Sequence, residues 1–275
     1  MITEKNTVVN DLETRYLIGG EGRGSTVVFL HDGAWGASSD VTWGGVLPLA
    51  AQTHRVIAPD LLGFGGSAKA VRLDQSPFGF RLRHVYSLLD QIGASGPIHL
   101  VGNSFGGSIA LRALLDERLS GRLASVTSIS GTGGPWRSAT SAELGSYDGT
   151  REDMTRIVRL LCDDYPGIEE QIDARMRWAA MPGHYAGMLA PHAKPPEPLR
   201  TARPADPYPE PFAEVTTPVL VFDCAGDPLV ERGWVKHLTD RCQTVTVAPV
   251  PHKHAPNISH PEQTWSFIAD FVRGA

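Results

Sequence analysis

A single serine is flanked by glycines in the run Gly102-Asn103-Ser104-Phe105-Gly106. An apolar stretch at 98–101 precedes the run, and a stretch typical of a helix follows it at 108–115. Strand, glycine-flanked serine and helix are the setting of a nucleophile elbow, whose turn leaves no room for side chains two residues before and after the serine. The pattern predicts that Ser104 is a nucleophile held at the positive end of a helix. The alternative is a serine that only caps the helix.

A serine hydroxyl needs a base to accept its proton and an acid to orient that base. In this kind of fold the acid and then the histidine follow the serine along the chain. Asp227 comes shortly after an apolar strand, and His254 lies between the last strand and the last helix. Both are then expected at the carboxyl ends of parallel strands, where ligands bind in open α/β sheets. Asp223, at the end of the same strand, is an alternative acid.

Two backbone N–H groups are expected to stabilise an oxyanion formed in the reaction. One belongs to Phe105, directly after the nucleophile. The other is expected in the loop 31–36, which follows the strand 27–30, and we assign it to Gly33.

The histidines His252, His254 and His260 crowd one segment near the end of the chain. A metal site is one interpretation, because two of them are two residues apart. No acidic or cysteine partner lies nearby at a ligand spacing, so we expect no metal and no cofactor. We expect His260 to cap the last helix.

Short apolar segments alternate with helical segments along most of the chain. This alternation predicts an α/β fold with a mostly parallel sheet covered on both faces. Segments 14–18 and 25–30 are interpreted as a hairpin joined by a glycine-rich turn, and helices are expected at 41–52 and 229–238.

The middle of the chain interrupts the alternation. Helical periodicity at 153–161 and 168–181 sits between a Gly/Ser/Thr-rich loop and the proline-dense segment 191–211, which we expect to be irregular. We therefore predict one α/β core made of residues 1–135 and 214–275, with a helical cap at 136–213.

Composition excludes several classes of protein. With 275 residues, 41% hydrophobic and 20% charged, the chain resembles an ordinary globular domain. The net charge of −5 and the lack of a basic cluster argue against a nucleic-acid or anionic-membrane partner. No signal peptide and no membrane span is expected. The three cysteines, Cys162, Cys224 and Cys242, are odd in number and far apart, which favours reduced, buried thiols in the cytoplasm.

Taken together, these motifs resemble the α/β-hydrolase superfamily over nearly the whole chain. Within it the chain is similar to the meta-cleavage-product hydrolases, which break a carbon–carbon bond in vinylogous 1,5-diketones formed by ring opening of catechols. The similarity rests on Asn103 before the nucleophile, on the segment 174–178 with 181–183, and on the histidine segment 254–262.

The resemblance implies that Arg175, on a cap helix, binds the carboxylate of a dienoate substrate; otherwise it is a solvated cap residue. Asn103 would bind substrate or support the elbow, and Trp35 and Trp178 are further candidate substrate contacts. The chain departs from the family where Asp32, Ala34 and Trp35 replace parts of a glycine-rich loop, where Thr42 replaces an asparagine, and where Ala255 replaces a tryptophan.

The sequence thus predicts a cofactor-free serine hydrolase acting on a small hydrophobic substrate that carries a carboxylate or carbonyl. Carbon–carbon cleavage is the leading hypothesis. Hydrolysis of a carboxylic ester or lactone is the alternative, because the same three side chains serve both. A non-catalytic ligand-binding protein of the same fold is a third, and the cap could support a homodimer.

Overall fold

The computed structural model describes residues 1–94, 96–190, 196–202 and 205–275. The strands are β1 (Thr3–Val9), β2 (Leu12–Gly19), β3 (Thr26–Leu30), β4 (Arg55–Pro59), β5 (Ile98–Asn103), β6 (Leu123–Ile129), β7 (Val219–Cys224) and β8 (Val245–Val250). The helices are α1 (Ser39–Trp43), α2 (Leu47–Ala50), α3 (Pro77–Gln91), α4 (Phe105–Ala113), α5 (Glu117–Ser120), α6 (Arg151–Leu161), α7 (Ile168–Ala179), α8 (His184–Leu189), α9 (Glu197–Ala202), α10 (Lys236–Thr239), α11 (Pro256–Ser259) and α12 (Pro261–Gly274), with short 3-10 segments at Ala139–Gly145 and Glu210–Glu214.

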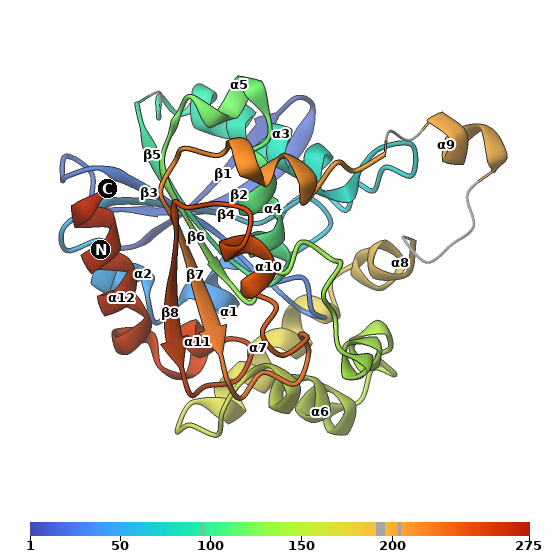
Figure 1. Ribbon diagram of the computed structural model, residues 1–275. Helices are drawn as coiled ribbons and strands as arrows, with labels where there is room; N and C mark the ends of the chain where they lie inside the picture. The colour runs from blue at the N-terminus through green and yellow to red at the C-terminus, as the bar shows by residue number, and fades with distance from the viewer. Residues whose placement is uncertain (95, 191–195, 203–204) are drawn as a thin grey trace.

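The eight strands form one sheet in the order β1-β2-β4-β3-β5-β6-β7-β8. The first two strands run antiparallel, and β3 to β8 pair in parallel, which confirms the mostly parallel α/β sheet. All parallel strands therefore end at the same edge. In Figure 1 the cap helices α6 and α7 lie beyond the carboxyl ends of β7 and β8.

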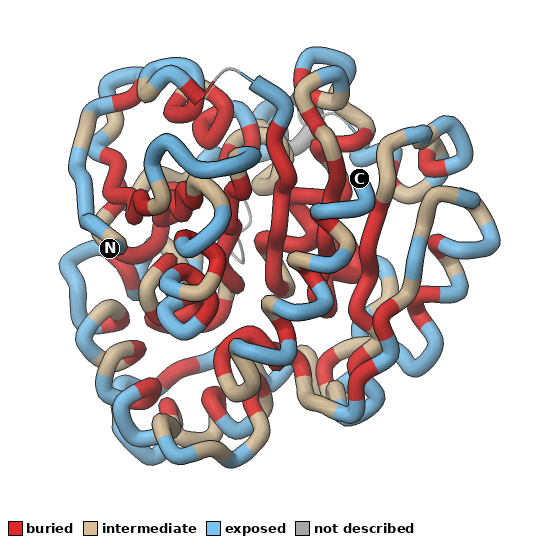
Figure 2. Tube along the Cα trace, turned by 90° about the vertical axis from the view of Figure 1, so that its left-hand side faces the viewer, coloured by how far each residue is buried: buried red, intermediate tan, exposed pale blue. Residues whose placement is uncertain are grey.

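Each face of the sheet has its own apolar core because successive strand side chains point to opposite faces. In β3, Val28 and Leu30 pack with residues of α3 and α4, whereas Val27 and Phe29 pack with residues of α1, α2 and α12. Both faces are covered, and Figure 2 shows the buried residues concentrated in the central strands. A third apolar cluster joins the cap to the core, since it contains residues of α6 and α7 together with Ala34, Trp35, Leu229, Ala255 and Ile258.

Three local predictions about the strands and helices of the core are wrong. β2 and β3 are not a hairpin, because β4 lies between them and pairs with both. On its other side β2 pairs with β1, and Asn10 and Asp11, both in the left-handed conformation, form the turn between them. β1 is a mostly exposed edge strand that lacks an apolar pattern. The helix expected at 41–52 is divided into α1 and α2, and the one expected at 229–238 shrinks to α10.

The proline-dense segment contains the short helix α9, contrary to the expected irregular structure. Residues 191–195 and 203–204 of that segment lie outside the described residues. The described helices include none long and apolar enough to cross a bilayer. The cap boundaries at 136 and 213 stay a prediction; the structure places α6, α7, α8 and α9 between β6 and β7.

Candidate active site

Ser104 lies in a strained turn between β5 and α4. Its φ and ψ are 53° and −113°, a left-handed conformation that non-glycine residues rarely adopt. A Cβ on Gly102 would lie 2.2 Å from the carbonyl oxygen of Gly106, and a Cβ on Gly106 would lie 2.2 Å from that of Leu30. The tight packing therefore explains why glycine occupies both positions, and the turn holds Ser104 at the edge of the sheet.

His254 and Asp227 are joined by a hydrogen bond of 2.7 Å between the histidine Nδ1 and the carboxylate Oδ2. Both side chains are almost completely buried, with 4% and 0% exposed. Burial alone would raise the pKa of Asp227, but the adjacent imidazole lowers it below its ordinary value. Within the described chain no hydrogen bond links Asp223 to His254, so the acid on this histidine is Asp227.

The other ring nitrogen of His254, Nε2, is buried and has no hydrogen-bond partner among the described residues. His254 and Ser104 line the same cavity, which has a volume of about 790 Å³. With Nδ1 committed to the carboxylate, Nε2 is the nitrogen that can exchange a proton with a group in this cavity.

Gly33 and Phe105 line the same cavity next to Ser104. The two residues touch, since a Cβ on Gly33 would lie 2.8 Å from the Cβ of Phe105. The loop after β3 and the N-terminus of α4 therefore meet beside the serine. This is the arrangement that an oxyanion site made of two backbone N–H groups requires.

Asn103 is fully buried and is not among the described residues that line the cavity. Its side-chain amide donates to the carbonyl oxygens of His254, at 3.1 Å, and of Ile129, at 3.3 Å. These contacts favour the alternative in which Asn103 supports the elbow and ties it to the histidine loop.

Arg175 is also fully buried, and its partner is a carboxylate of the protein itself. Its Nη2 lies 2.8 Å from Oδ2 of Asp32, and its Nη1 lies 3.3 Å from Oδ1 of Asp32 and 3.2 Å from the carbonyl oxygen of Trp35. Thr42 donates to the same carboxylate at 2.6 Å. Arg175 is absent from the described residues that line the cavity. Its contacts therefore favour a structural role. This position matches neither of the two expectations for Arg175, which were contact with substrate and exposure to solvent.

Trp35 and Trp178 lie outside the described lining of the cavity as well. The Trp35 indole is buried and donates to the carbonyl oxygen of Leu144. The Trp178 ring lies beneath the Arg15 guanidinium at 4.8 Å. Both side chains join the cap to the core, so substrate contact by either one stays a prediction that the geometry does not favour.

The family model of the alpha/beta hydrolase family matches residues 27–266. The chain belongs to the alpha/beta hydrolase family. It is 30% identical to 2-hydroxy-6-oxo-6-(2'-aminophenyl)hexa-2,4-dienoic acid hydrolase of Metapseudomonas resinovorans, over 96% of this chain and 91% of that protein.

This hydrolase also resembles solved structures over its full length. A serine hydrolase involved in carbazole degradation (CarC enzyme) is 26% identical, with a TM-score of 0.82 and coverage of 100% of both chains. The 2-hydroxy-6-oxo-6-phenylhexa-2,4-dienoate hydrolase of Rhodococcus sp. strain RHA1 shares the fold, with 22% identity, a TM-score of 0.85 and coverage of 99% of both chains. The resemblance to meta-cleavage-product hydrolases is confirmed.

Apart from Met188, an apolar cap residue that the sequence marks as a candidate substrate contact, most of the apolar cavity wall consists of residues that the sequence did not single out. Apolar side chains line much of it: Phe64, Phe78, Leu144, Leu161, Met188, Leu229 and Val230. Two arginines, Arg81 and Arg137, line it too. Arg81 is on α3, in a segment whose pattern is that of any amphipathic helix, so no local signal marks it.

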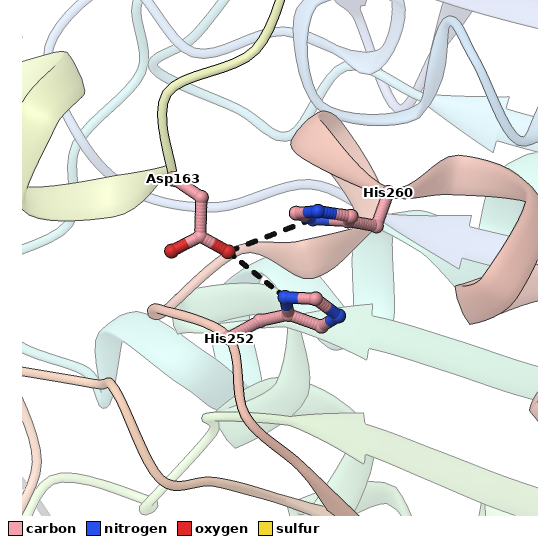
Figure 3. Close-up of side chains that lie close together, drawn as sticks. All are labelled: Asp163, His252 and His260. Atoms are coloured by element: carbon pink, nitrogen blue, oxygen red, sulfur yellow. Dashed lines mark hydrogen bonds and ion pairs between the residues drawn. The ribbon is translucent and has the colours of Figure 1, made fainter.

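A second polar cluster lies behind the histidine loop, where Asp163 meets His252 and His260 (Figure 3). The expectation of no metal relied on a missing acidic partner, but the fold brings Asp163 within 2.9 Å of the His252 Nδ1. The two imidazole rings stack at 3.7 Å with planes 22° apart. An ion in the plane of one ring would lie out of the plane of the other, so one ring would have to rotate before both could bind it. In the present geometry the cluster joins the end of α6 to the loop of His254.

The three cysteines of this hydrolase are free and buried. Burial raises the pKa of Cys162 and of Cys224 to about 12. Thiolates are the reactive form of cysteine, so these two thiols are inert at neutral pH.

Acid is expected to weaken the fold through Asp32. Burial alone would raise the pKa of Asp32, but Arg175 outweighs it and lowers that pKa from 3.8 to about 2. A carboxylate whose pKa is lower in the folded state contributes stability above its unfolded pKa and loses it as the pH falls to the folded value. Between pH 5 and pH 2 the wild type should lose about 2 kcal/mol more unfolding free energy than Asp32→Asn/Arg175→Met, which lacks the pair. Urea unfolding at several pH values measures this difference, and parallel losses in both proteins would contradict it.

Proposed function

We propose that this hydrolase cleaves a carbon–carbon bond in a vinylogous 1,5-diketone acid, the ring-fission product of a catechol, with Ser104, His254 and Asp227 as its catalytic residues. The observation that carries the proposal is that a strained Ser104 lines the same cavity as a buried His254, whose Nδ1 is held by Asp227 and whose Nε2 is free. The Metapseudomonas resinovorans relative, named for a dienoic acid, supports this class of substrate.

The chemistry begins with a proton shift, because the dienol must become a ketone before a carbanion can leave. His254, through its free Nε2, moves this proton. The same nitrogen then accepts the proton of Ser104 as the serine oxygen adds to the ketone carbonyl. Asp227 stabilises the imidazolium that results.

Charge develops on the carbonyl oxygen when the nucleophile adds. The backbone N–H groups of Gly33 and Phe105 are assigned to bind that oxygen. The carbon–carbon bond then breaks, and its electron pair enters the conjugated dienoate, which takes a proton from His254. A water that gives its proton to His254 then hydrolyses the acyl ester left on Ser104, and His254 returns a proton to the serine oxygen. The apolar wall of the cavity suits a hydrophobic or aromatic group on the other side of the ketone.

A homodimer and a cytoplasmic setting stay predictions.

Two substrates offered side by side distinguish carbon–carbon cleavage from ester hydrolysis. A ring-fission dienoate is yellow, and its bleaching reports cleavage, while a nitrophenyl ester of similar size releases nitrophenolate. We expect a dienoate kcat/KM that exceeds the ester value by at least about 100-fold, since a site complementary to the transition state of the dienoate does not stabilise that of the ester equally. Preference for the ester would instead assign this site to ester hydrolysis. Ser104→Ala serves as the control for background reaction with both substrates.

A further inference from the structure

The cavity that holds Ser104 has an unbalanced charge. Its described lining residues include the arginines Arg81 and Arg137 and no aspartate or glutamate. Arg137 is exposed, whereas only 6% of the Arg81 surface is exposed. A buried guanidinium beside an apolar wall, with no carboxylate in the same lining, favours an anionic ligand.

The contacts of Arg81 leave part of its guanidinium free. Its Nε donates to the carbonyl oxygen of Leu62 at 2.7 Å, and its Nη1 donates to that of Pro77 at 3.0 Å. The group carries five N–H donors, and no described residue accepts a hydrogen bond from Nη2. The guanidinium carbon lies 5.2 Å from the centre of the Phe105 ring, which belongs to the residue directly after Ser104.

Arg81 has no acidic partner among the described residues, and the direction of its pKa shift agrees with that. Burial lowers the pKa of Arg81 to about 10, with no carboxylate opposing the shift, so the group stays charged at neutral pH. Arg175 differs, because both of its terminal nitrogens contact Asp32. Of these two buried arginines, only Arg81 faces the cavity and lacks a counter-charge.

We infer that Arg81, rather than Arg175, binds a carboxylate of the substrate, with the free edge of its guanidinium in the cavity. The inference rests on the proposed function for the identity of that substrate. The two bound carbonyl groups and the Phe64 and Phe105 rings hold the guanidinium in place. A fixed arginine of this kind binds a carboxylate through paired, charge-assisted hydrogen bonds.

Binding to the Ser104→Ala protein tests this without turnover. The probes are 2-hydroxy-6-oxo-6-phenylhexa-2,4-dienoate and its neutral methyl ester, and their absorbance change on binding gives Kd. Adding Arg81→Gln should raise the Kd of the acid by about 10- to 100-fold, because a hydrogen bond between two charged groups is lost. The Kd of the ester should change by less than about threefold, because the ester carries no charge. Arg83→Gln, an exposed position on the same helix, is the matched control and should change neither Kd.

Equal weakening of acid and ester by Arg81→Gln would overturn the inference, because Arg81 would then only shape the cavity. Loss of acid binding on Arg137→Gln with none on Arg81→Gln would overturn it as well. If Arg81→Gln does not fold, Arg81→Lys is used in its place. It keeps the charge without the paired donors, so it should retain part of the preference for the acid.

A second pair of probes separates this inference from the proposed function. Benzoate should raise the Tm of the wild-type protein and benzamide should not, and Arg81→Gln should abolish the benzoate shift. An Arg81-dependent benzoate shift in a protein that does not cleave the dienoate would support the carboxylate site and reject the proposed reaction. Cleavage of the dienoate with an unchanged benzoate shift in Arg81→Gln would reject the carboxylate site alone.

Discussion

Replacing Ser104 with alanine is expected to lower kcat for the preferred substrate by about 10⁴- to 10⁶-fold. The reason is that His254 would have no hydroxyl to activate, although its hydrogen bond to Asp227 would remain. The loss should fall on kcat more than on KM, because the hydroxyl acts on the reacting carbon and contributes little to holding the substrate. Single-turnover absorbance measurements with the variant in excess report it directly.

A serine-directed phosphonate gives an independent reading of the same residue. It should label the wild-type protein at Ser104 and leave Ser104→Ala unlabelled. Ser266→Ala, an exposed serine on α12, should be labelled and active like the wild type. A wild-type protein that resists the phosphonate and turns over no substrate would favour the ligand-binding alternative over an enzyme.

Arg175→Met is expected to lower the free energy of unfolding by about 3–5 kcal/mol, because it leaves Asp32 buried without its counter-charge. Asp32 is 1% exposed and Arg175 is 0% exposed, so water cannot take the place of the missing partner. Among the described residues, the carboxylate would retain as hydrogen-bond donors the hydroxyl of Thr42 and the backbone N–H of Ala34. Urea unfolding at pH 7 measures the loss.

The double variant Asp32→Asn/Arg175→Met separates the ion pair from the packing around it. Removing both charges should recover more than half of the stability that Arg175→Met loses, since no uncompensated charge remains. Arg177→Met, an exposed position two residues along α7, should change the stability by less than about 0.5 kcal/mol. A loss of the same size in the single and double variants would mean that packing, and not charge, accounts for it.

The parts of the site that could be predicted from the sequence are those fixed by local geometry. The elbow requires glycine at 102 and 106 because a Cβ at either position would clash with a backbone carbonyl oxygen. This requirement produces a recognisable pattern of five consecutive residues in the sequence. The acid and the histidine could be placed because parallel strands end at one edge of the sheet, so each loop after a strand is near the nucleophile. Periodicity was sufficient for α6 and α7.

The parts that could not be predicted depend on contacts between distant residues. Asp32 and Arg175 are 143 residues apart, and in sequence Asp32 is only a departure from a glycine-rich loop. The structure shows that Asp32, Thr42 and Arg175 form one hydrogen-bonded group, so two departures from the family pattern belong together. Likewise, β1 is an exposed edge strand without an apolar pattern, and the strand that separates β2 from β3 comes later in the chain.

The ion pair between Asp32 and Arg175 also bears on where substrate can enter the cavity and product can leave it. It joins a cap helix to the loop that carries Gly33. If the cap opened there, two charges buried away from water would have to separate. Opening the cap at this point is therefore expected to cost several kcal/mol in each turnover. The cavity wall also includes the exposed residues Arg137, Ala142, Gly145 and Ser146, and a substrate that enters beside them would leave this ion pair intact.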